Sequence, residues 1–280
     1  MRLIDSRPVR FGELAGPLPH GSAVFDWQIA ALQAFMSAVD YSFRDLIESG
    51  HTPHAPVVVG ATVHRYPTLG DTFSVDIVPC NVGETSVELR YDITDGAGET
   101  LSTARAVHVT IGPEGGAVSI PAAVREQFAE AAVGDTPAVG PSEDAATGDY
   151  PTFAETFTVR SPHVEAISLA YFAEYPRFAA VALEGFLDDQ GQSLASLSGG
   201  RQPFRLVGWE WEFSRPVPFE TRLRVSADVR HVSENAVRIE HTFSEEGEVC
   251  IAGRTEYGCF DRDGERTAFP GVALAPFRDA

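Results

Sequence analysis

The sequence predicts an α+β fold made of two tandem copies of one unit, each a long central helix wrapped by a curved antiparallel sheet. Residues 64–94 and 214–244 align without a gap once Arg65 is placed on Arg215, an offset of 150 (215 minus 65). Apolar positions match where identity fails, as for Phe73 and Leu223. In both halves a helical pattern precedes four strand-like segments. One structural unit used twice accounts for these observations.

The first half is predicted to run strand, helix, four-strand meander and closing helix. A short strand is expected at 5–12, and a long helix at roughly 22–48, because apolar residues recur there every three or four positions on nearly all faces. Only a strongly curved sheet could cover such a helix. Alternating patterns with glycine-containing turns predict four strands, at about 55–66, 72–80, 84–94 and 100–111. Residues 119–132 indicate the closing helix.

The second half repeats this order. A strand is expected from about 153, then a helix at 163–187 that Pro176 kinks or divides. Four strands follow, at about 204–215, 222–231, 235–244 and 248–261. The predicted domains are therefore 1–132 and 153–280, joined by a Pro-, Gly-, Ser- and Asp-rich linker at 133–152. A chain of 280 residues is long enough for each half to bury its own core.

The charge balance disfavours several classes of partner. Forty acidic residues against twenty-one Lys and Arg give a net charge of −19, and lysine is absent. Such a surface repels nucleic-acid phosphates and anionic lipid. A high-salt cytoplasm or GC-rich codon usage would each explain the bias. No signal-peptide core and no apolar run near the roughly 18 residues of a membrane span is visible. Three cysteines without CxxC spacing fit a reducing compartment, so we expect a cytoplasmic protein.

Several motifs resemble a known family. Pro67, Gly70-Asp71 and Val82-Gly83 lie at the predicted turns between strands of the first meander. Arg215-Pro216 and Val232 occupy the equivalent positions of the second meander. Residues 163–178 (HVEAISLAYFAEYPRF) are similar to a helix start of the HVNN type. Together these features resemble a hotdog domain, and more specifically the 4-hydroxybenzoyl-CoA thioesterase family. The resemblance covers most of the chain outside the linker and the C-terminal tail.

The resemblance implies that two hotdogs pair within the chain into one continuous sheet, a double hotdog. Acyl-thioester sites would form where the helix of one half faces the other, and one or both of the two could have been lost. The implied partner is acyl-CoA or an acyl thioester of acyl carrier protein (acyl-ACP), with no cofactor or metal and no nucleic acid or membrane. Assembly beyond the internal pseudo-dimer stays open.

In this family a backbone N–H at the start of the central helix polarises the thioester carbonyl, and a carboxylate directs water. The corresponding segments are His20-Gly21-Ser22 and His163-Val164-Glu165. Neither half carries the family acid in place: Glu13 is the only acid just before the first helix, and Ile29 occupies the helical position. Catalytic candidates are Asp26, His163, Glu165 and His20, and substrate-binding candidates are Gly21, Ser22, Val164, Arg65 and Arg215.

Each candidate has a structural alternative. Asp26 and Glu165 could serve the helix dipole as first-turn acids, and His20 could be a surface turn residue. Tyr171 and Glu174 are expected in the core or at the interface. The leading hypothesis is an acyl-thioester hydrolase. The rival is a non-catalytic acyl-binding or scaffold protein. A third interpretation, a hotdog dehydratase or hydratase, requires a D-x-x-x-x-H dyad that this sequence lacks.

Overall fold

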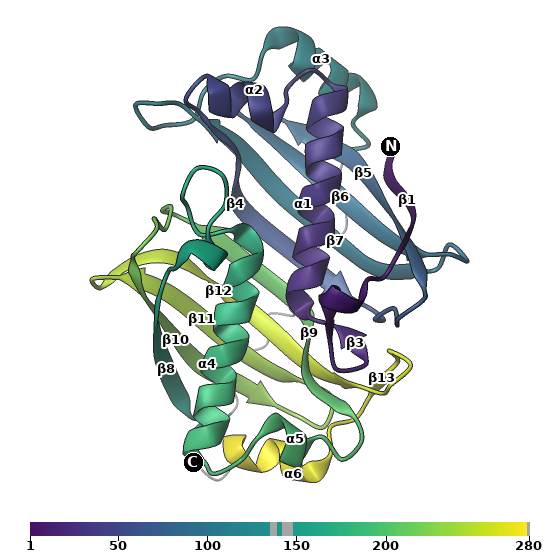
Figure 1. Ribbon diagram of the computed structural model, residues 1–280, viewed down its shortest axis with the longest axis vertical. Coiled ribbons are helices and arrows are strands. Elements are labelled where there is room, and N and C mark those ends of the chain that lie inside the picture. Colours follow the sequence, from purple (N-terminus) through teal and green to yellow (C-terminus); the bar gives the residue numbers. More distant parts are fainter. Residues whose placement is uncertain (135–138, 142–147, 279–280) are drawn as a thin grey trace.

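One continuous antiparallel sheet carries both long helices on the same face (Figure 1). The computed structural model describes residues 1–134, 139–141 and 148–278. The strand order is β1-β5-β6-β7-β4-β9-β12-β11-β10-β8, with β13 paired to β12. Helix α1 (Gly21–Ala38) covers the first half of the sheet, and α4 (Tyr175–Asp189) covers the second. The predicted pair of helix-wrapping curved sheets is confirmed.

The meander of each half follows the predicted alternation. The strands of the first half are β1 (Arg2–Pro8), β4 (Thr52–Val63), β5 (Thr72–Val82), β6 (Ser86–Asp95) and β7 (Thr100–Ile111). Those of the second half are β8 (Thr152–Thr158), β9 (Gln202–Phe213), β10 (Arg222–Val232), β11 (Val237–Glu245), β12 (Glu248–Phe260) and β13 (Arg266–Thr267). Residues alternate between the helix-covered face and the opposite face, so each strand buries one set of side chains against its helix.

The two halves join through strands β4 and β9. These strands pair antiparallel from Val58 opposite Glu212 to Thr62 opposite Gly208. Because each is the first meander strand of its half, the pairing brings equivalent edges together and sets α1 beside α4. Of the predicted linker, residues 135–138 and 142–147 lie outside the described residues, and the boundaries at 133 and 152 stay a prediction.

The first helix is shorter than predicted. Instead of one helix at 22–48, α1 ends at Ala38 and a separate α2 (Phe43–Glu48) follows. Asp40 adopts φ 56° in the left-handed region, which interrupts the helix, and the Ser42 hydroxyl then caps α2 by accepting from the Asp45 N–H. The break turns Tyr41 inward, where its hydroxyl donates to Thr110. Helical periodicity continued through this break, so the pattern alone did not reveal it.

The second helix begins later than predicted. Residues Ser161–His163 form a short 3-10 turn (η2), and α4 starts at Tyr175 after another 3-10 turn at Phe172–Glu174 (η3). Pro176 lies in the first turn of α4, where its missing N–H costs nothing, so it begins the helix and does not kink it. The prediction that His163-Val164-Glu165 opens the helix is therefore wrong.

The remaining helices are short. Helix α3 (Ala122–Ala131) matches the predicted closing helix. The segment after α4 contains α5 (Leu194–Leu197), and the C-terminal tail contains α6 (Gly271–Leu274) and a 3-10 turn η4 (Ala275–Phe277). Ahead of α1 lie a 3-10 turn η1 (Phe11–Glu13) and a two-stranded turn of β2 (Leu14–Ala15) and β3 (Leu18–Pro19). Within the described residues, no helix has the length and apolarity needed to cross a bilayer.

The duplication extends into the helices once the offset becomes 151. Buried positions then coincide: Trp27 with Phe178, Leu32 with Leu183, and Phe35 with Phe186. The residues preceding the helical segments also correspond, since His20 and Tyr171 both adopt extended N-cap conformations (φ −63° and −65°). Segment η3–α4 is thus the counterpart of α1, and one extra residue lies in the turn before it.

Glycine at position 253 allows strand β12 to lie beneath the indole of Trp211. A Cβ at this position would come within 2.6 Å of both Cα and Cδ1 of Trp211, so β9 would have to shift. We expect Gly253→Ala to lower the free energy of unfolding by about 1–3 kcal/mol through overpacking. Gly271→Ala is the matched control, because a Cβ there meets nothing within 4 Å. Denaturant unfolding checks this, and equal midpoints for the two variants would contradict the packing.

Candidate functional site

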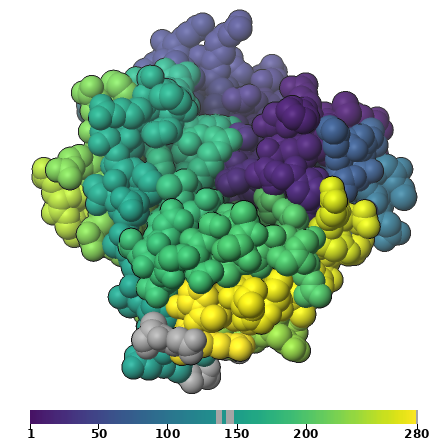
Figure 2. All heavy atoms as spheres, turned by 60° about the horizontal axis from the view of Figure 1, so that its bottom comes forward, coloured from purple at the N-terminus to yellow at the C-terminus, as the bar shows by residue number. Residues whose placement is uncertain are grey.

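The first turn of α1 is held at the junction between the halves. Arg205, near the start of β9, donates to the carbonyl oxygens of Ala15 and Pro19 in the turn that leads into α1. Figure 2 shows this N-terminal segment (purple) against the green segment that follows α4. A Cβ on Gly21 would lie 2.9 Å from Cγ of Leu206, so only glycine lets the helix start approach β9 this closely.

His20 caps α1 in its neutral form. Its Nδ1 accepts from the Ser22 N–H at 3.1 Å and its carbonyl from the Ala23 N–H at 2.8 Å. Burial, with the charges of Arg205 and Arg177, lowers the pKa of His20 to about 4. Because Nδ1 is an acceptor, the ring proton belongs on Nε2. The backbone N–H of Gly21, a buried residue, has no hydrogen-bond partner among the described residues.

Asp26 lies on α1 and faces the second half. Its side chain is 35% exposed, the Tyr171 hydroxyl donates to its carboxylate, and Nη2 of Arg177 lies 3.6 Å from its Oδ2. Burial raises the pKa of Asp26 above its usual value, while Tyr171 and Arg177 oppose that rise. A carboxylate near the start of a helix whose pKa is raised by burial is a candidate general base.

Arg177 occupies on α4 the position that Asp26 occupies on α1. At the offset of 151 the two are equivalent, so an acid and a base face each other where the duplication would have placed identical residues. Arg177 also pairs with Glu174, whose buried carboxylate lies at the N-terminal end of α4. That helix end therefore carries its own anion and no counterpart of Asp26. The two helix ends are therefore unequal: α1 carries Asp26, whereas the α4 end carries Glu174 paired with Arg177.

Glu13 and His163 each stabilise a turn by accepting a hydrogen bond from a nearby backbone N–H. Burial acts to raise the pKa of Glu13, but bonds from the Arg10 N–H (2.8 Å), Arg7 (2.5 Å) and Trp27 Nε1 (3.1 Å) outweigh it and lower that pKa. His163 is the counterpart of Glu13 at the offset of 150 and caps the Arg160 N–H in the same way, at 3.1 Å.

Glu165 and Val164 belong to the turn before η3. Glu165 accepts from the N–H groups of Ile167 and Leu169, both at 3.3 Å, and burial raises its pKa. Val164 bridges Ala170 in the same turn. These residues precede α4 by about ten positions, so they do not offer the first-turn amides that the sequence indicated.

The predicted CoA-binding arginines are both paired with carboxylates. Arg65 contacts Asp95 and lies 3.5 Å from Glu265, and Arg215 contacts Glu248. Arg65 lines a cavity of about 320 Å³ together with Asp71 and Asp95. A role of either arginine in substrate binding stays a prediction.

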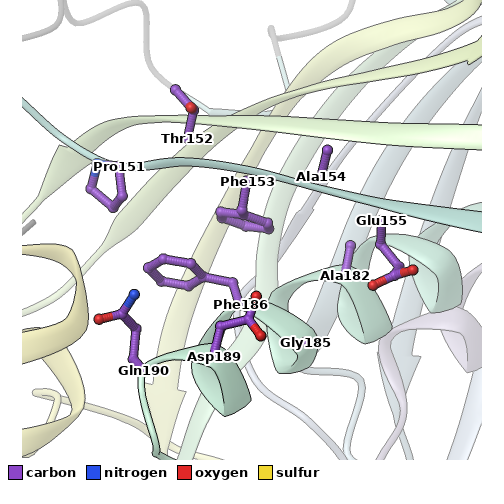
Figure 3. A pocket seen from close by; sticks show the side chains of 10 residues that line it. All are labelled: Pro151, Thr152, Phe153, Ala154, Glu155, Ala182, Gly185, Phe186, Asp189 and Gln190. Atoms are coloured by element: carbon purple, nitrogen blue, oxygen red, sulfur yellow. The ribbon is translucent and has the colours of Figure 1, made fainter.

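A second cavity of about 320 Å³ lies between the edge strand β8 and α4. Figure 3 shows Phe153 and Phe186 side by side in it, with stacked rings 4.7 Å apart, and the carboxylates of Glu155 and Asp189 at its sides. Neither of the two cavities includes Asp26 in its lining. In the described part of the chain, no three His, Cys, Asp or Glu side chains gather closely enough to hold a metal ion.

Comparison with solved structures identifies the architecture. A 12:0-ACP thioesterase from Umbellularia californica superposes with a TM-score of 0.70 over 92% of this chain and 93% of its own, at 17% identity. An acyl-ACP thioesterase from Bacteroides thetaiotaomicron gives a TM-score of 0.64 over 92% and 96%, at 15% identity. The chain is a double hotdog.

A third double hotdog, assigned provisionally as an oleoyl thioesterase from Lactobacillus plantarum, gives a TM-score of 0.75 over 93% of this chain and 97% of its own, at 12% identity. No protein-family model and no curated protein matches the sequence. At these identities the likeness is one of fold, so the residues of the site must carry the functional conclusion.

Asp26 and Arg177 occupy equivalent positions of the repeat, but the offset of 150 residues concealed this equivalence. That offset places Asp26 on Pro176, and only the one-residue insertion before η3 brings Arg177 into register. The expectation that Tyr171 and Glu174 lie at the interface or in the core fits their positions, since Glu174 is buried and Tyr171 contacts α1 through Asp26. Their proximity to a candidate catalytic carboxylate was not foreseen.

The electrostatic coupling across the junction can be measured by NMR. We expect the His20 ring to stay neutral down to about pH 4. Arg177→Met should raise the pKa of both His20 and Asp26, because the Arg177 charge lowers both. Arg44→Met, an exposed arginine on α2, is the matched control. Ring and carboxyl chemical shifts followed against pH check this, and pKa values unmoved by Arg177→Met would contradict the pairing.

Proposed function

We propose that this protein hydrolyses acyl thioesters of CoA or of an acyl carrier protein at the first turn of α1. The observation that carries the proposal is Asp26: a half-buried carboxylate of raised pKa on the helix whose N-terminal amide is free. The fold supports it, because the three solved double hotdogs described above are assigned as thioesterases. The chemistry requires water and the thioester, and no cofactor.

In the proposed reaction the thioester carbonyl oxygen accepts a hydrogen bond from the Gly21 N–H. The positive end of the α1 dipole and the His20 Nε2–H stabilise the charge that develops on this oxygen. Asp26 takes a proton from a water molecule, whose oxygen forms the new bond to the carbonyl carbon. The carbon–sulfur bond then breaks, and the leaving thiolate receives the proton from Asp26.

Residues of the second half orient the carboxylate. The Tyr171 hydroxyl occupies one oxygen of Asp26, and Arg177 favours its ionised form against the effect of burial. Arg177 is itself shared with Glu174, which moderates its charge. The site is therefore composite, with the amide and the carboxylate from the first half and the orienting groups from the second. We propose one such site per chain, because the α4 end has Arg177 in place of the carboxylate.

The remaining sequence candidates enter the proposal with smaller roles. Ser22 lies in the first turn beside Gly21 and keeps the His20 ring in place. Arg65 and Arg215 could meet the CoA phosphates only by exchanging their present carboxylate partners. His163, Val164 and Glu165 shape the turn before η3. A cytoplasmic location stays a prediction.

The assignment of the carboxylate is tested by two substitutions. Asp26→Asn should lower kcat for acyl-CoA hydrolysis by about 10²–10⁴-fold, the usual contribution of a positioned general base. Glu165→Gln is the matched control and should retain most of the activity, because Glu165 accepts bonds from its own turn. Release of free CoA thiol across several acyl groups is the measurement.

Other outcomes would overturn the proposal. Full activity of Asp26→Asn would remove Asp26 from the mechanism, and a large loss in Glu165→Gln alone would transfer its role to Glu165. The absence of the family acid in both halves favours the rival, a non-catalytic acyl-binding protein. Tight binding of acyl-CoA by the wild type without any release of thiol would establish that rival.

A further inference from the structure

Strand β9 places large aromatic side chains where its counterpart carries small ones. On its helix-facing side lie Trp209 and Trp211, both fully buried, followed by Phe213. At the offset of 150 the corresponding residues of β4 are Val59, Ala61 and Val63. The duplicated sheet is thus symmetric in its backbone and asymmetric in the volume of its side chains at the junction.

These rings meet α1 beside the proposed site. Phe25 directly precedes Asp26, and its ring stacks on Trp209 with centroids 4.4 Å apart and an interplanar angle of 20°. The Phe25 ring also lies 4.8 Å, centroid to centroid, from the ring of Phe172 in η3. Below the first turn, Leu206 packs against Gly21. An acyl chain that leaves a carbonyl bound at Gly21 therefore encounters packed rings from both halves.

The aromatic wall is fixed in place. The Trp211 Nε1 donates to Thr255 Oγ1 at 3.0 Å, and Gly253 leaves room only for the present position of that indole. The Trp209 Nε1 is buried and has no hydrogen-bond partner among the described residues. The methylene groups of a long acyl chain could enter only if these close-packed rings moved apart. Displacing a stacked ring from a close-packed interior carries a free-energy penalty.

Resting on the proposed function, we propose that Phe25, Trp209 and Trp211 limit the substrate to short acyl thioesters. Phe25, Trp209 and Trp211 are fully buried beside the first turn of α1, so a short acyl group displaces less of this packing than a long one. Two tryptophans of the second half and Phe25 of the first thereby set the specificity of a site whose amide and carboxylate belong to the first half.

The acyl-length profile of the intact protein tests this directly. Hydrolysis of acetyl-, butyryl-, octanoyl- and dodecanoyl-CoA should give the highest kcat/KM for the first two. Trp209→Leu and Trp211→Leu should each raise the ratio of octanoyl to butyryl kcat/KM by at least about tenfold, since each adds room for several methylene groups. A wild type that prefers dodecanoyl-CoA, or a ratio unchanged in both variants, would overturn the proposal.

Phe128→Leu is the control for loss of a buried ring. Phe128 lies on α3 and stacks on Phe35 at 5.6 Å, towards the other end of α1. We expect this variant to lose stability without changing the acyl-length ratio. If either Trp-to-Leu variant fails to fold, Trp209→Phe and Trp211→Phe keep most of the packing and should shift the ratio in the same direction by a smaller factor.

Binding of non-hydrolysable thioether analogues separates this inference from the hydrolysis itself. We expect butyryl-CoA thioether to bind at least about tenfold more tightly than the dodecanoyl analogue. Selective binding of the butyryl analogue without any hydrolysis would uphold the length limit and end the hydrolase proposal. Hydrolysis that favours long chains would do the reverse. Binding of neither analogue, together with no hydrolysis, would overturn both.

Discussion

The antiparallel pairing of β4 with β9 determines what the rest of the molecule can do. It joins the two sheets edge to edge, and it sets α1 and α4 side by side with equivalent positions facing each other. A residue that points across the junction therefore meets its own counterpart, as Asp26 meets Arg177, or a residue close to that counterpart, as Val59 meets Trp211. In a symmetric dimer the same substitution would appear on both sides, whereas a fused duplication can change each side separately.

The two halves of this chain differ at two places along the junction. One is the pair of equivalent helix positions, which became Asp26 and Arg177 and attract each other where two carboxylates would repel. The other is the inner face of the paired strands, with small residues on β4 and tryptophans on β9. Both changes act at the same end of α1. In the proposed site the first half supplies the amide and the carboxylate, and the second half supplies the residues that surround and orient them.

The sequence predicted the architecture well because hydrophobic alternation and the repeat report directly on a duplicated sheet. It failed where local backbone geometry decided the outcome. Asp40 ended α1 inside a continuous apolar pattern, and Pro176 began α4 instead of interrupting it. The site was predicted only in part. His20, Gly21 and Asp26 come together at one helix, but the contribution of Arg177 and Tyr171 depends on contacts between residues about 150 positions apart, which no local pattern encodes.

Counting the ligands bound per chain tests most directly whether the molecule has one active site or two. Calorimetric titration of the intact chain with the thioether analogue of butyryl-CoA gives the number bound per chain. Divergence of Asp26 and Arg177 predicts one molecule per chain. Two molecules bound with comparable affinity would mean that the α4 end is also a site and would contradict the asymmetry on which the proposed function rests.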